Sequence, residues 1–346
     1  MITTHTTGTF RRVAAGTAVL LALGGLTSCG GNAGAENSDG STTLRYQSAA
    51  GMVDLVQLAD ALGYLKDIEL EKKGDVTGGP QSLQALVSDQ VDIASSPFFG
   101  ATAQLVATGA PIKAVVSSYG SSGDISQSLI VLKDSPVRSA RDLIGKKVAV
   151  NTLGANFEAV LDTWFEKEGL TEEEIKDITL VVLPPLNTEE ALRAGQIDAA
   201  YLSSGSIHVA EKRGGIRSVF KDTDVVGPYN GGGAVLQERF LDANPDAATE
   251  VATGIAKAVE YINAHTRDEV LKVYDGWLED NGYGDYVEAV DANWPGGTGV
   301  PTKDASIRDQ DISLWLDWLG SRGDVDPDAI KPSDVYTNEF NEEAGS

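Results

Sequence analysis

Apolar positions follow two spacings along the chain, and together they predict an alternation of strands and helices. From Val53 to Leu65 the apolar residues recur at helical spacing, with Leu55, Leu58 and Leu62 on one face. Short apolar runs flank this segment, as strands do. In order, the pattern predicts a strand at 43–48, helices at 53–65 and 82–88, a strand at 91–94, a helix from Pro97 and a strand at 112–118.

A second segment has the same organisation. Strands are predicted at 146–151, 178–183 and 197–202, with a helix at 157–170. Strands that alternate with helices of this length are typical of an α/β fold with mostly parallel sheets.

The two segments also share a sequence repeat. "ALVSDQVDIA" begins at Ala85 and "ALRAGQIDAA" at Ala191, 106 residues later, and Gly63 and Gly169 have the same separation. A long-period similarity of this kind usually marks a duplicated structural unit. We therefore expect two similar α/β lobes, in which the segments that begin at Ala85 and Ala191 have the same secondary structure.

The last third of the chain is predicted to be helical. Helical spacing covers 245–265, 268–282 and 306–322, and Trp315 and Trp318 fall on one face, where core packing is expected. The Gly-rich segment 225–236 predicts a crossover back to the first lobe. The expected division is lobe 1 at 43–121 and 228–346, with the C-terminal helices, and lobe 2 at 122–227.

The N-terminus has the form of a secretory signal. Arg11 and Arg12 precede an apolar run from Val13 to Leu26, which is too short to span a membrane. The sequence "LTSC" that ends at Cys29 resembles the lipobox of bacterial lipoproteins. The resemblance implies a signal peptide at 1–28, lipid attached to Cys29 and a flexible spacer over 29–42. The alternative is a plain secretory signal followed by an unrelated cysteine.

Composition narrows the function classes. The net charge of −24 argues against nucleic-acid binding, which needs a basic surface, and favours a solvated monomer. Cys29 is the only cysteine, and few histidines are available, so neither disulfides nor a thiolate or histidine metal site is expected. The acidic run at 324–329 lacks the Gly and Glu of a calcium-binding loop. No cofactor is expected.

Several longer motifs resemble a known family. They are the repeat that begins at Ala85, "GAPIK" at 109–113, "SARDLIGKKVAV" from Ser139 and "NPDAATEVATGIAKAVEYI" from Asn244. With these motifs the chain resembles the type 2 periplasmic binding proteins of the sulfonate, taurine, nitrate and thiamine-pyrimidine group, which are the solute receptors of ABC importers. The resemblance implies two lobes joined by crossovers, a ligand cleft between them, and an ABC permease and ATPase as partners. It also implies a location on the extracytoplasmic face of the cell membrane, with the lipid as the only membrane contact.

The candidate ligand-binding residues lie where predicted strands end. Ligands of open α/β sheets bind outside the carboxyl ends of the strands. Helices that follow "SAAG" (48–51) and "NTLG" (151–154) are expected to point their N-termini at an anion, without help from Lys or Arg. The candidates are Gln47, Ser48, Gly51, Ser95, Ser96, Ser118, Tyr119, Thr152, Gly154, Asn156, Tyr201 and Asn230.

These residues predict delivery of a small organic or inorganic anion, of the aliphatic sulfonate, taurine or nitrate class, to an ABC importer. A neutral or aromatic solute, such as a pyrimidine precursor of thiamine or an aromatic acid, is an alternative that suits Tyr119, Tyr201 and Phe157. An enzyme of the same fold that makes a pyrimidine is a second alternative, but its Cys-rich segment has no counterpart here. No nucleophile elbow, P-loop or dinucleotide motif is present in the sequence. A stand-alone adhesin or sensor lipoprotein is a further alternative.

Overall fold

A computed structural model describes residues 34, 37, 40–76, 78–326 and 328–345. The predicted signal peptide, Cys29 and most of the predicted spacer lie outside the described residues. Within the described residues, no helix combines the length and the apolar character needed to cross a membrane.

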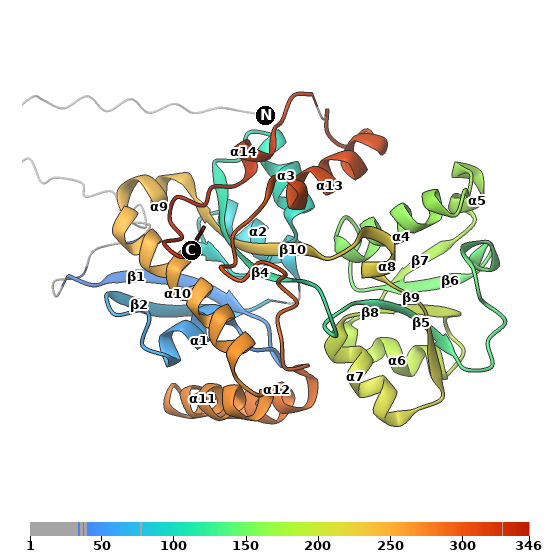
Figure 1. Ribbon diagram of the computed structural model, residues 1–346, viewed down its shortest axis with the longest axis horizontal. Coiled ribbons are helices and arrows are strands. Elements are labelled where there is room, and N and C mark those ends of the chain that lie inside the picture. Colours follow the sequence, from blue (N-terminus) through green and yellow to red (C-terminus); the bar gives the residue numbers. More distant parts are fainter. Residues whose placement is uncertain (1–33, 35–36, 38–39, 77, 327, 346) are drawn as a thin grey trace, which may run out of the picture. The chain divides into compact units, whose positions relative to one another are not determined.

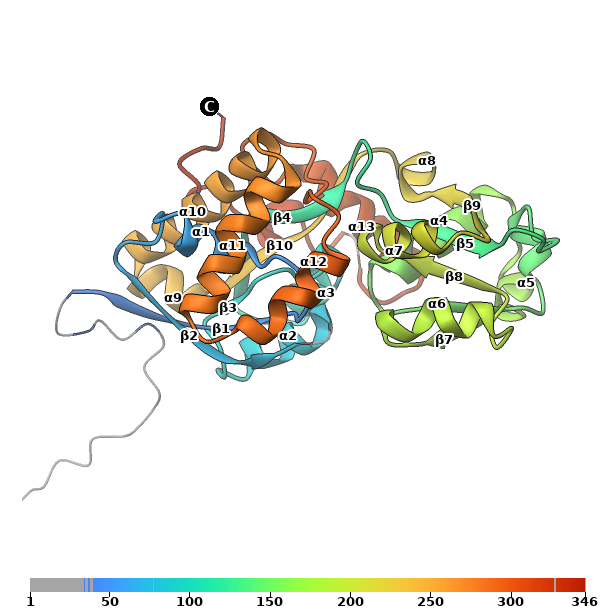
Figure 2. The same ribbon diagram turned by 90° about the horizontal axis from the view of Figure 1, so that it is seen from below.

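The first part of the chain, together with the later strand β10, forms two small sheets (Figures 1 and 2). Strand β1 pairs in parallel with β2, and strand β10 lies between β3 and β4 in a second, three-stranded sheet that is antiparallel throughout. We call these two sheets the N-terminal sheets. Their strands and the helices between them are β1 (Thr42–Ser48), α1 (Leu55–Ala61), β2 (Ile68–Asp75), α2 (Gly79–Val87), β3 (Ile93–Ala94), α3 (Phe99–Ala107), β4 (Ile112–Ser121) and β10 (Tyr229–Gln237).

The middle of the chain forms one five-stranded sheet, in the order β7-β6-β8-β5-β9. Strand β6 is parallel to β7 and β8, whereas β5 is antiparallel to β8 and β9. Its elements are β5 (Ser128–Leu132), η1 (Ala140–Leu143), β6 (Lys147–Val150), α4 (Asn156–Lys167), α5 (Glu172–Lys176), β7 (Thr179–Val182), α6 (Pro185–Arg193), β8 (Ala199–Leu202), α7 (Ser204–Arg213), β9 (Ile216–Lys221) and α8 (Asp222–Val226).

The C-terminal third is helical, as predicted. Helices α10 and α11 both pack on α1, and α13 contacts α3 on one side and α4 on the other (Figures 1 and 2). Trp315 and Trp318 of α13 are buried, which confirms the prediction that they pack in the core. The elements are α9 (Glu238–Ala243), α10 (Pro245–Ala264), α11 (Arg267–Asp280), η2 (Gly284–Tyr286), α12 (Val287–Asn293), α13 (Asp309–Ser321) and α14 (Pro332–Val335).

The α/β fold is therefore confirmed, and the sheets are mixed. The antiparallel pairs all involve β5 or β10, the strands that begin just after the chain passes from one group of sheets to the other.

The Gly-rich segment 225–236, predicted as a crossover, also forms a strand that was not predicted. Most of it belongs to β10, and every residue of this strand is buried. A Cβ atom at Gly232 would lie 2.1 Å from the carbonyl oxygen of Pro97, and one at Gly233 would lie 2.1 Å from that of Val116. The glycines therefore allow close packing of a central strand.

The repeated segments have the same local structure. Each runs from a helix (α2 or α6) into a strand (β3 or β8), through a residue with a left-handed backbone, Asp89 (φ 61°) or Gly195 (φ 68°). The shared Asp then accepts a 2.9 Å hydrogen bond from the backbone of the neighbouring strand, Asp92 from Arg45 and Asp198 from Lys147. The sequence repeat is thus also a repeat of structure.

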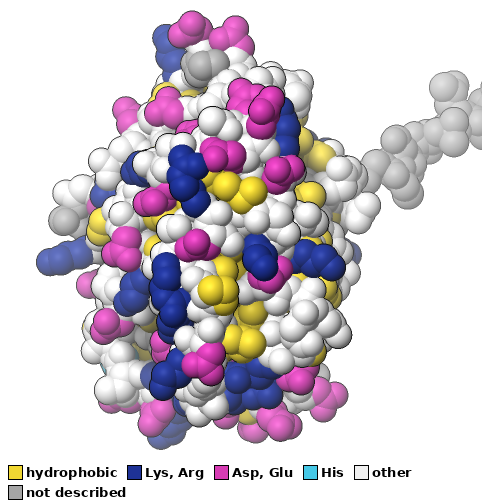
Figure 3. Space-filling model, turned by 90° about the vertical axis from the view of Figure 1, so that its right-hand side faces the viewer, with side chains coloured by type: hydrophobic (Ala, Val, Ile, Leu, Met, Phe, Trp, Pro, Cys, Tyr) yellow, Lys and Arg dark blue, Asp and Glu magenta, His cyan; other side chains and the backbone are white. Residues whose placement is uncertain are grey.

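The end of the molecule on the right of Figure 1 has mixed charge. Figure 3 shows basic and acidic side chains side by side on this face, with a few apolar side chains between them. Several of the basic residues in this part of the chain form ion pairs, such as Arg141 with Glu174 and Lys146 with Asp198.

Candidate functional site

A cavity of about 270 Å³ lies where residues of the N-terminal sheets approach residues that follow β8. Gln47 is near the end of β1, Ser95 and Ser96 follow β3, and Ser203 and Ser204 follow β8. Strand ends therefore contribute to the wall, as expected for an α/β sheet protein. The polar lining residues are Gln47, Asp54, Ser82, Ser95, Ser96, Ser118, Tyr119, Ser126, Gln127, Ser203, Ser204 and Thr298, and the apolar ones include Ala49, Met52, Val53, Leu55, Val76, Ile125, Trp294 and Pro295.

Serine hydroxyls dominate the polar part of the wall. The Ser118 hydroxyl donates to the Ser96 hydroxyl at 2.9 Å, so these neighbours order each other. Hydroxyl groups can both donate and accept, which suits a solute with several polar atoms. Burial raises the pKa of the Tyr119 phenol, so this side chain is neutral and can act only through its ring or its hydroxyl group.

Asp54 is the only charged residue among the described residues that line the cavity. It is the N-cap of α1, where its Oδ1 accepts hydrogen bonds from the backbone N–H groups of Val56 (2.9 Å) and Gln57 (3.3 Å). Burial raises the pKa of Asp54 to about 6, against the lowering effect of these hydrogen bonds. The described residues that line the cavity therefore include one carboxylate and no cationic side chain.

The two helix N-termini that were expected to meet an anion differ in their contacts. Asp54 caps α1, whereas the N-cap of α4, Ala155, provides no side-chain cap. Oε2 of Glu158 accepts a 2.6 Å hydrogen bond from the backbone N–H of Gly154, just before α4, and Glu158 forms a 2.7 Å ion pair with Arg322. A carboxylate therefore lies close to each terminus, and an anion held between the two termini stays a prediction.

The predicted site residues fall into three groups. Gln47, Ser95, Ser96, Ser118 and Tyr119 line the cavity. Ser48 and Gly51 instead line a smaller hollow of about 10 Å³, next to Met52, which borders both spaces. The residues Thr152, Gly154, Asn156, Tyr201 and Asn230 line neither space.

Three residues of the last group have contacts that explain their burial. Tyr201 packs against Phe157, with ring centroids 4.8 Å apart. The Asn230 amide donates to Oδ2 of Asp311 (2.8 Å), and Oδ1 of Asn156 accepts from the Tyr229 hydroxyl (3.2 Å).

The cavity also includes residues that sequence analysis did not name. Asp54 precedes an apolar helical segment, which is the ordinary signal of an N-cap and gives no indication of a binding role. Trp294, Pro295 and Thr298 belong to a segment between α12 and α13, far from any strand end, and the sequence holds no signal that places them here. Gln127 precedes β5, a strand that sequence analysis did not predict.

A buried polar network lies where the chain passes between the two groups of sheets. Asp222, at the start of α8, is fully buried, and its carboxylate accepts hydrogen bonds from the hydroxyls of Ser121 (2.5 Å) and Tyr229 (3.0 Å). The backbone N–H groups of Gln127 (3.2 Å) and Thr223 (2.8 Å) also donate to it. Burial raises the pKa of Asp222, and the hydrogen bonds oppose that shift.

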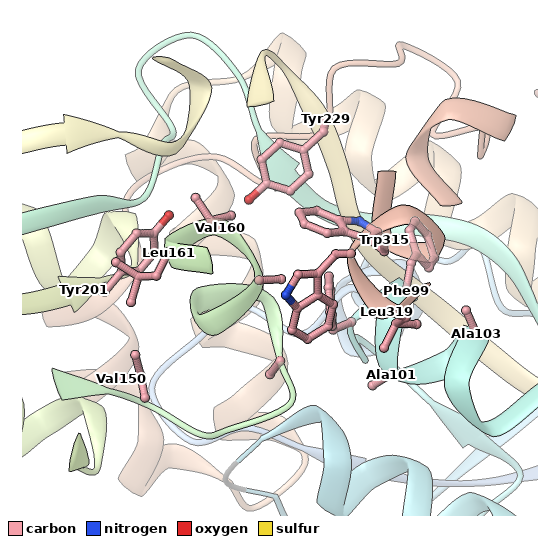
Figure 4. Close-up of a cluster of buried hydrophobic side chains, with 14 of the residues drawn as sticks. Phe99, Ala101, Ala103, Val150, Val160, Leu161, Tyr201, Tyr229, Trp315 and Leu319 are labelled. Carbon is pink, nitrogen blue, oxygen red and sulfur yellow. The ribbon is translucent and has the colours of Figure 1, made fainter. Parts of the chain in front are cut away.

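The aromatic residues beside this network form a continuous cluster. Figure 4 shows Tyr229 next to Trp315 of α13 and Tyr201 on the side of the five-stranded sheet. The rings of Tyr229 and Trp315 meet edge to face, with centroids 5.4 Å apart. The segments that connect the two groups of sheets are therefore held both by the hydrogen bonds of Asp222 and by the contact of Tyr229 with Trp315.

The fold is the one found in solved structures of periplasmic binding proteins. Residues 55–268, more than half of the chain, match the family described as NMT1/THI5 like. The chain belongs to this family.

One curated relative is the nitrate import ATP-binding protein NrtC of Synechococcus elongatus, which is 29% identical over 115 residues. The matched stretch covers 33% of this chain and 17% of NrtC, so the chain spans less than a fifth of the length of that relative.

Solved structures with the same fold extend over most of the chain. A protein of Bordetella bronchiseptica RB50 has a TM-score of 0.67 at 22% identity and covers 87% of this chain and 96% of its own. The alkanesulfonate-binding protein SsuA from Xanthomonas axonopodis pv. citri, bound to MOPS, has a TM-score of 0.63 at 20% identity, with coverages of 85% and 98%. A mutant of the enzyme DszB in complex with biphenyl-2-sulfinic acid has a TM-score of 0.59 at 17% identity, with coverages of 87% and 98%.

Proposed function

We propose that this chain is the solute receptor of an ABC importer and that the cavity beside Asp54 holds the solute. The cavity is the observation that carries the proposal, because both the N-terminal sheets and the segment after β8 contribute to its wall. The family match and the fold shared with SsuA support it. An ABC permease and ATPase are the proposed partners, in line with the partial similarity to NrtC.

The proposal includes the division into two lobes, at 43–121 with 228–346 and at 122–227. A solute between Ser95 and Ser96 on one side and Ser203 and Ser204 on the other touches both lobes. Only a closed arrangement offers hydrogen bonds from both sides at once, so binding favours closure. The permease would then distinguish the loaded receptor from the empty one.

The location and the anchor are also part of the proposal. We infer that the chain is exported, cleaved before Cys29 and held by lipid on the extracytoplasmic face of the cell membrane as a monomer. The support is the lipobox-like sequence that ends at Cys29.

Two observations bear on the class of solute. No side chain caps the N-termini of α2 and α7 in the described part of the chain, and Gly79 and Ser204 at these ends line the cavity. Together with the serine hydroxyls, they favour a solute with an acidic oxygen group, such as a sulfonate. Asp54 opposes a solute that is only an anion, because two negative charges would share one small cavity. A zwitterionic or neutral solute therefore fits better than nitrate or an alkyl sulfonate.

A thermal-shift screen of purified residues 30–346 tests the proposal. Saturating solute at about 100 times its Kd should stabilise the protein by about 2.7 kcal/mol. Sulfonates, taurine, nitrate, aromatic acids and aminopyrimidines form the panel, and each solute that binds is recovered afterwards and identified by mass spectrometry. A receptor returns its solute unchanged. Chemical conversion of the bound solute would instead favour the enzyme alternative, and no shift with any member of the panel would contradict the proposed function.

A further inference from the structure

We propose that the solute carries a nitrogen with N–H donors, preferably a cationic amine, and that Asp54 binds this nitrogen. The inference rests on the proposed function and narrows the class of solute that the cavity accepts. Its basis, among the described residues, is a carboxylate on the cavity wall that has hydrogen-bond donors but no ion-pair partner, together with two lining glutamines whose side-chain oxygens have no donor.

The first observation is the unbalanced charge of Asp54. None of the described Lys and Arg residues forms an ion pair with it, and the nearby Lys72 is instead paired with Asp75 at 2.8 Å. Asp54 is half-buried, and a cationic ligand would supply the opposite charge that no described side chain pairs with it. Glu158, in the first turn of α4, already has such a partner in Arg322.

The second observation is a pair of glutamine side chains on the same wall. The side-chain carbonyl oxygens of Gln47 and Gln127 are enclosed and have no hydrogen-bond partner. Gln127 is only 7% exposed, so water reaches it poorly. Enclosed acceptors without partners cost free energy that a ligand donor can recover. Once its side chain turns toward the cavity, either glutamine can accept a hydrogen bond from a ligand N–H group.

The third observation is a network of hydrogen bonds that holds the backbone of Asp54 in place. Its backbone N–H donates to the Tyr274 hydroxyl of α11 (3.1 Å), and this hydroxyl donates to Oε1 of Gln57 (2.5 Å). The other end of the Gln57 amide donates to the Tyr46 hydroxyl (2.9 Å). This network holds the backbone of Asp54, and the N–H groups of Val56 and Gln57 hold its Oδ1, so the side chain needs little reorganisation to receive a cation.

The role of an ordinary helix cap does not account for these features. A cap carboxylate at a surface helix is stabilised by the helix dipole and keeps a low pKa. Burial instead raises the pKa of Asp54 to about 6. The residue therefore serves as a cap in an environment that disfavours its charge, and a bound ammonium group would make that environment favourable.

Matched pairs of solutes that differ in the amine test the inference by calorimetry. The pairs are taurine with ethanesulfonate, 4-aminopyrimidine with 4-methylpyrimidine, and benzylamine with benzyl alcohol. For any pair that binds, we expect the amine to bind wild type at least about tenfold more tightly, as a charge-assisted hydrogen bond would. Asp54→Asn and Asp54→Ser both keep a helix cap and remove the charge, and each should abolish this preference.

Asp142→Asn is the matched control, because Asp142 caps η1 and does not line the cavity. It should leave all affinities unchanged. Two results would overturn the inference and leave the proposed function intact. One is that wild type binds the amine-free solutes as tightly as the amines. The other is that both Asp54 variants keep an undiminished preference for the amines. Absence of binding by every solute would contradict the proposed function and this inference with it.

Discussion

Removal of one hydroxyl from the network at Asp222 should measurably destabilise the protein. The Tyr229 hydroxyl lies 3.0 Å from Oδ2 of Asp222 and 3.2 Å from Oδ1 of Asn156, and all three side chains are buried. In Tyr229→Phe the ring can keep its edge-to-face contact with Trp315. The substitution therefore isolates the hydrogen bond from the packing.

The expected loss follows from the charge of the acceptor. A hydrogen bond to a charged group contributes about 1.5–3 kcal/mol, and a buried carboxylate that loses one donor keeps its desolvation cost. Asp222 retains Ser121 and two backbone donors, so a loss of about 2 kcal/mol is expected. With an unfolding entropy of about 2.1 cal/mol/K per residue, a loss of this size in a 346-residue chain should lower Tm by about 3 °C.

Thermal and urea unfolding measure this loss, with Tyr336→Phe as the control. The Tyr336 hydroxyl donates to Asp309 at 2.8 Å, but this bond is exposed to water, so its removal should cost less than about 1 kcal/mol. The difference between the variants should shrink in acid, because Asp222, whose pKa is raised by burial, becomes neutral there and accepts weaker hydrogen bonds. Equal losses in the two variants at neutral pH would refute the stabilising role of the network.

Three further predictions concern the anchor and the cavity. Cys29→Ser should move the protein from the membrane fraction to the soluble fraction, and continued membrane association of this variant would contradict lipid attachment. Ser96→Ala should weaken solute binding by roughly tenfold in calorimetry, whereas Thr152→Ala should bind as wild type does, because only Ser96 lines the cavity. Binding of a cationic solute should weaken as the pH falls through about 6, since Asp54 in the free protein gains a proton there. Asp54→Asn should show no such pH dependence, and a wild-type affinity that is constant across this range would argue against a charged Asp54 in binding.

The sequence predicts most of the fold because its strands and helices have clear periodicities. The strands predicted at 43–48 and 197–202 and the helix at 157–170 agree closely with β1, β8 and α4. Strand β2 was not predicted, because its sequence "IELEKKGD" is mostly charged and it pairs only with β1. Strand β10 was also not predicted, because Gly is depleted in strands, and only the close approach of Pro97 and Val116 explains why Gly is required there.

The candidate site could be predicted only in part. Strand ends can be predicted from sequence, and four of the residues named for that reason line one cavity: Gln47, Ser95, Ser96 and Ser118. Thr152 and Gly154, which follow β6, were also named because they lie at the end of a predicted strand, yet they do not line the cavity. The segment at 294–298 reaches it only through tertiary packing, which periodicity does not encode.

The helix N-termini of α1 and α4, both predicted from the sequence to face an anion, differ in the charges that surround them. Asp54 satisfies α1 from the N-cap position, whereas Glu158 lies inside α4 and reaches back to the N–H of Gly154. Glu158 forms an ion pair with Arg322, the residue that directly follows α13. Arg322 lies more than 160 residues later in the chain. Asp54 receives no such partner from the described residues, although its neighbours hold it firmly. Each helix thus has a carboxylate near its start, but only the carboxylate of Glu158 has a cationic partner among the described residues. That difference supports the proposed recognition of a cationic solute by Asp54, and it makes the charge of the solute the quantity to measure first.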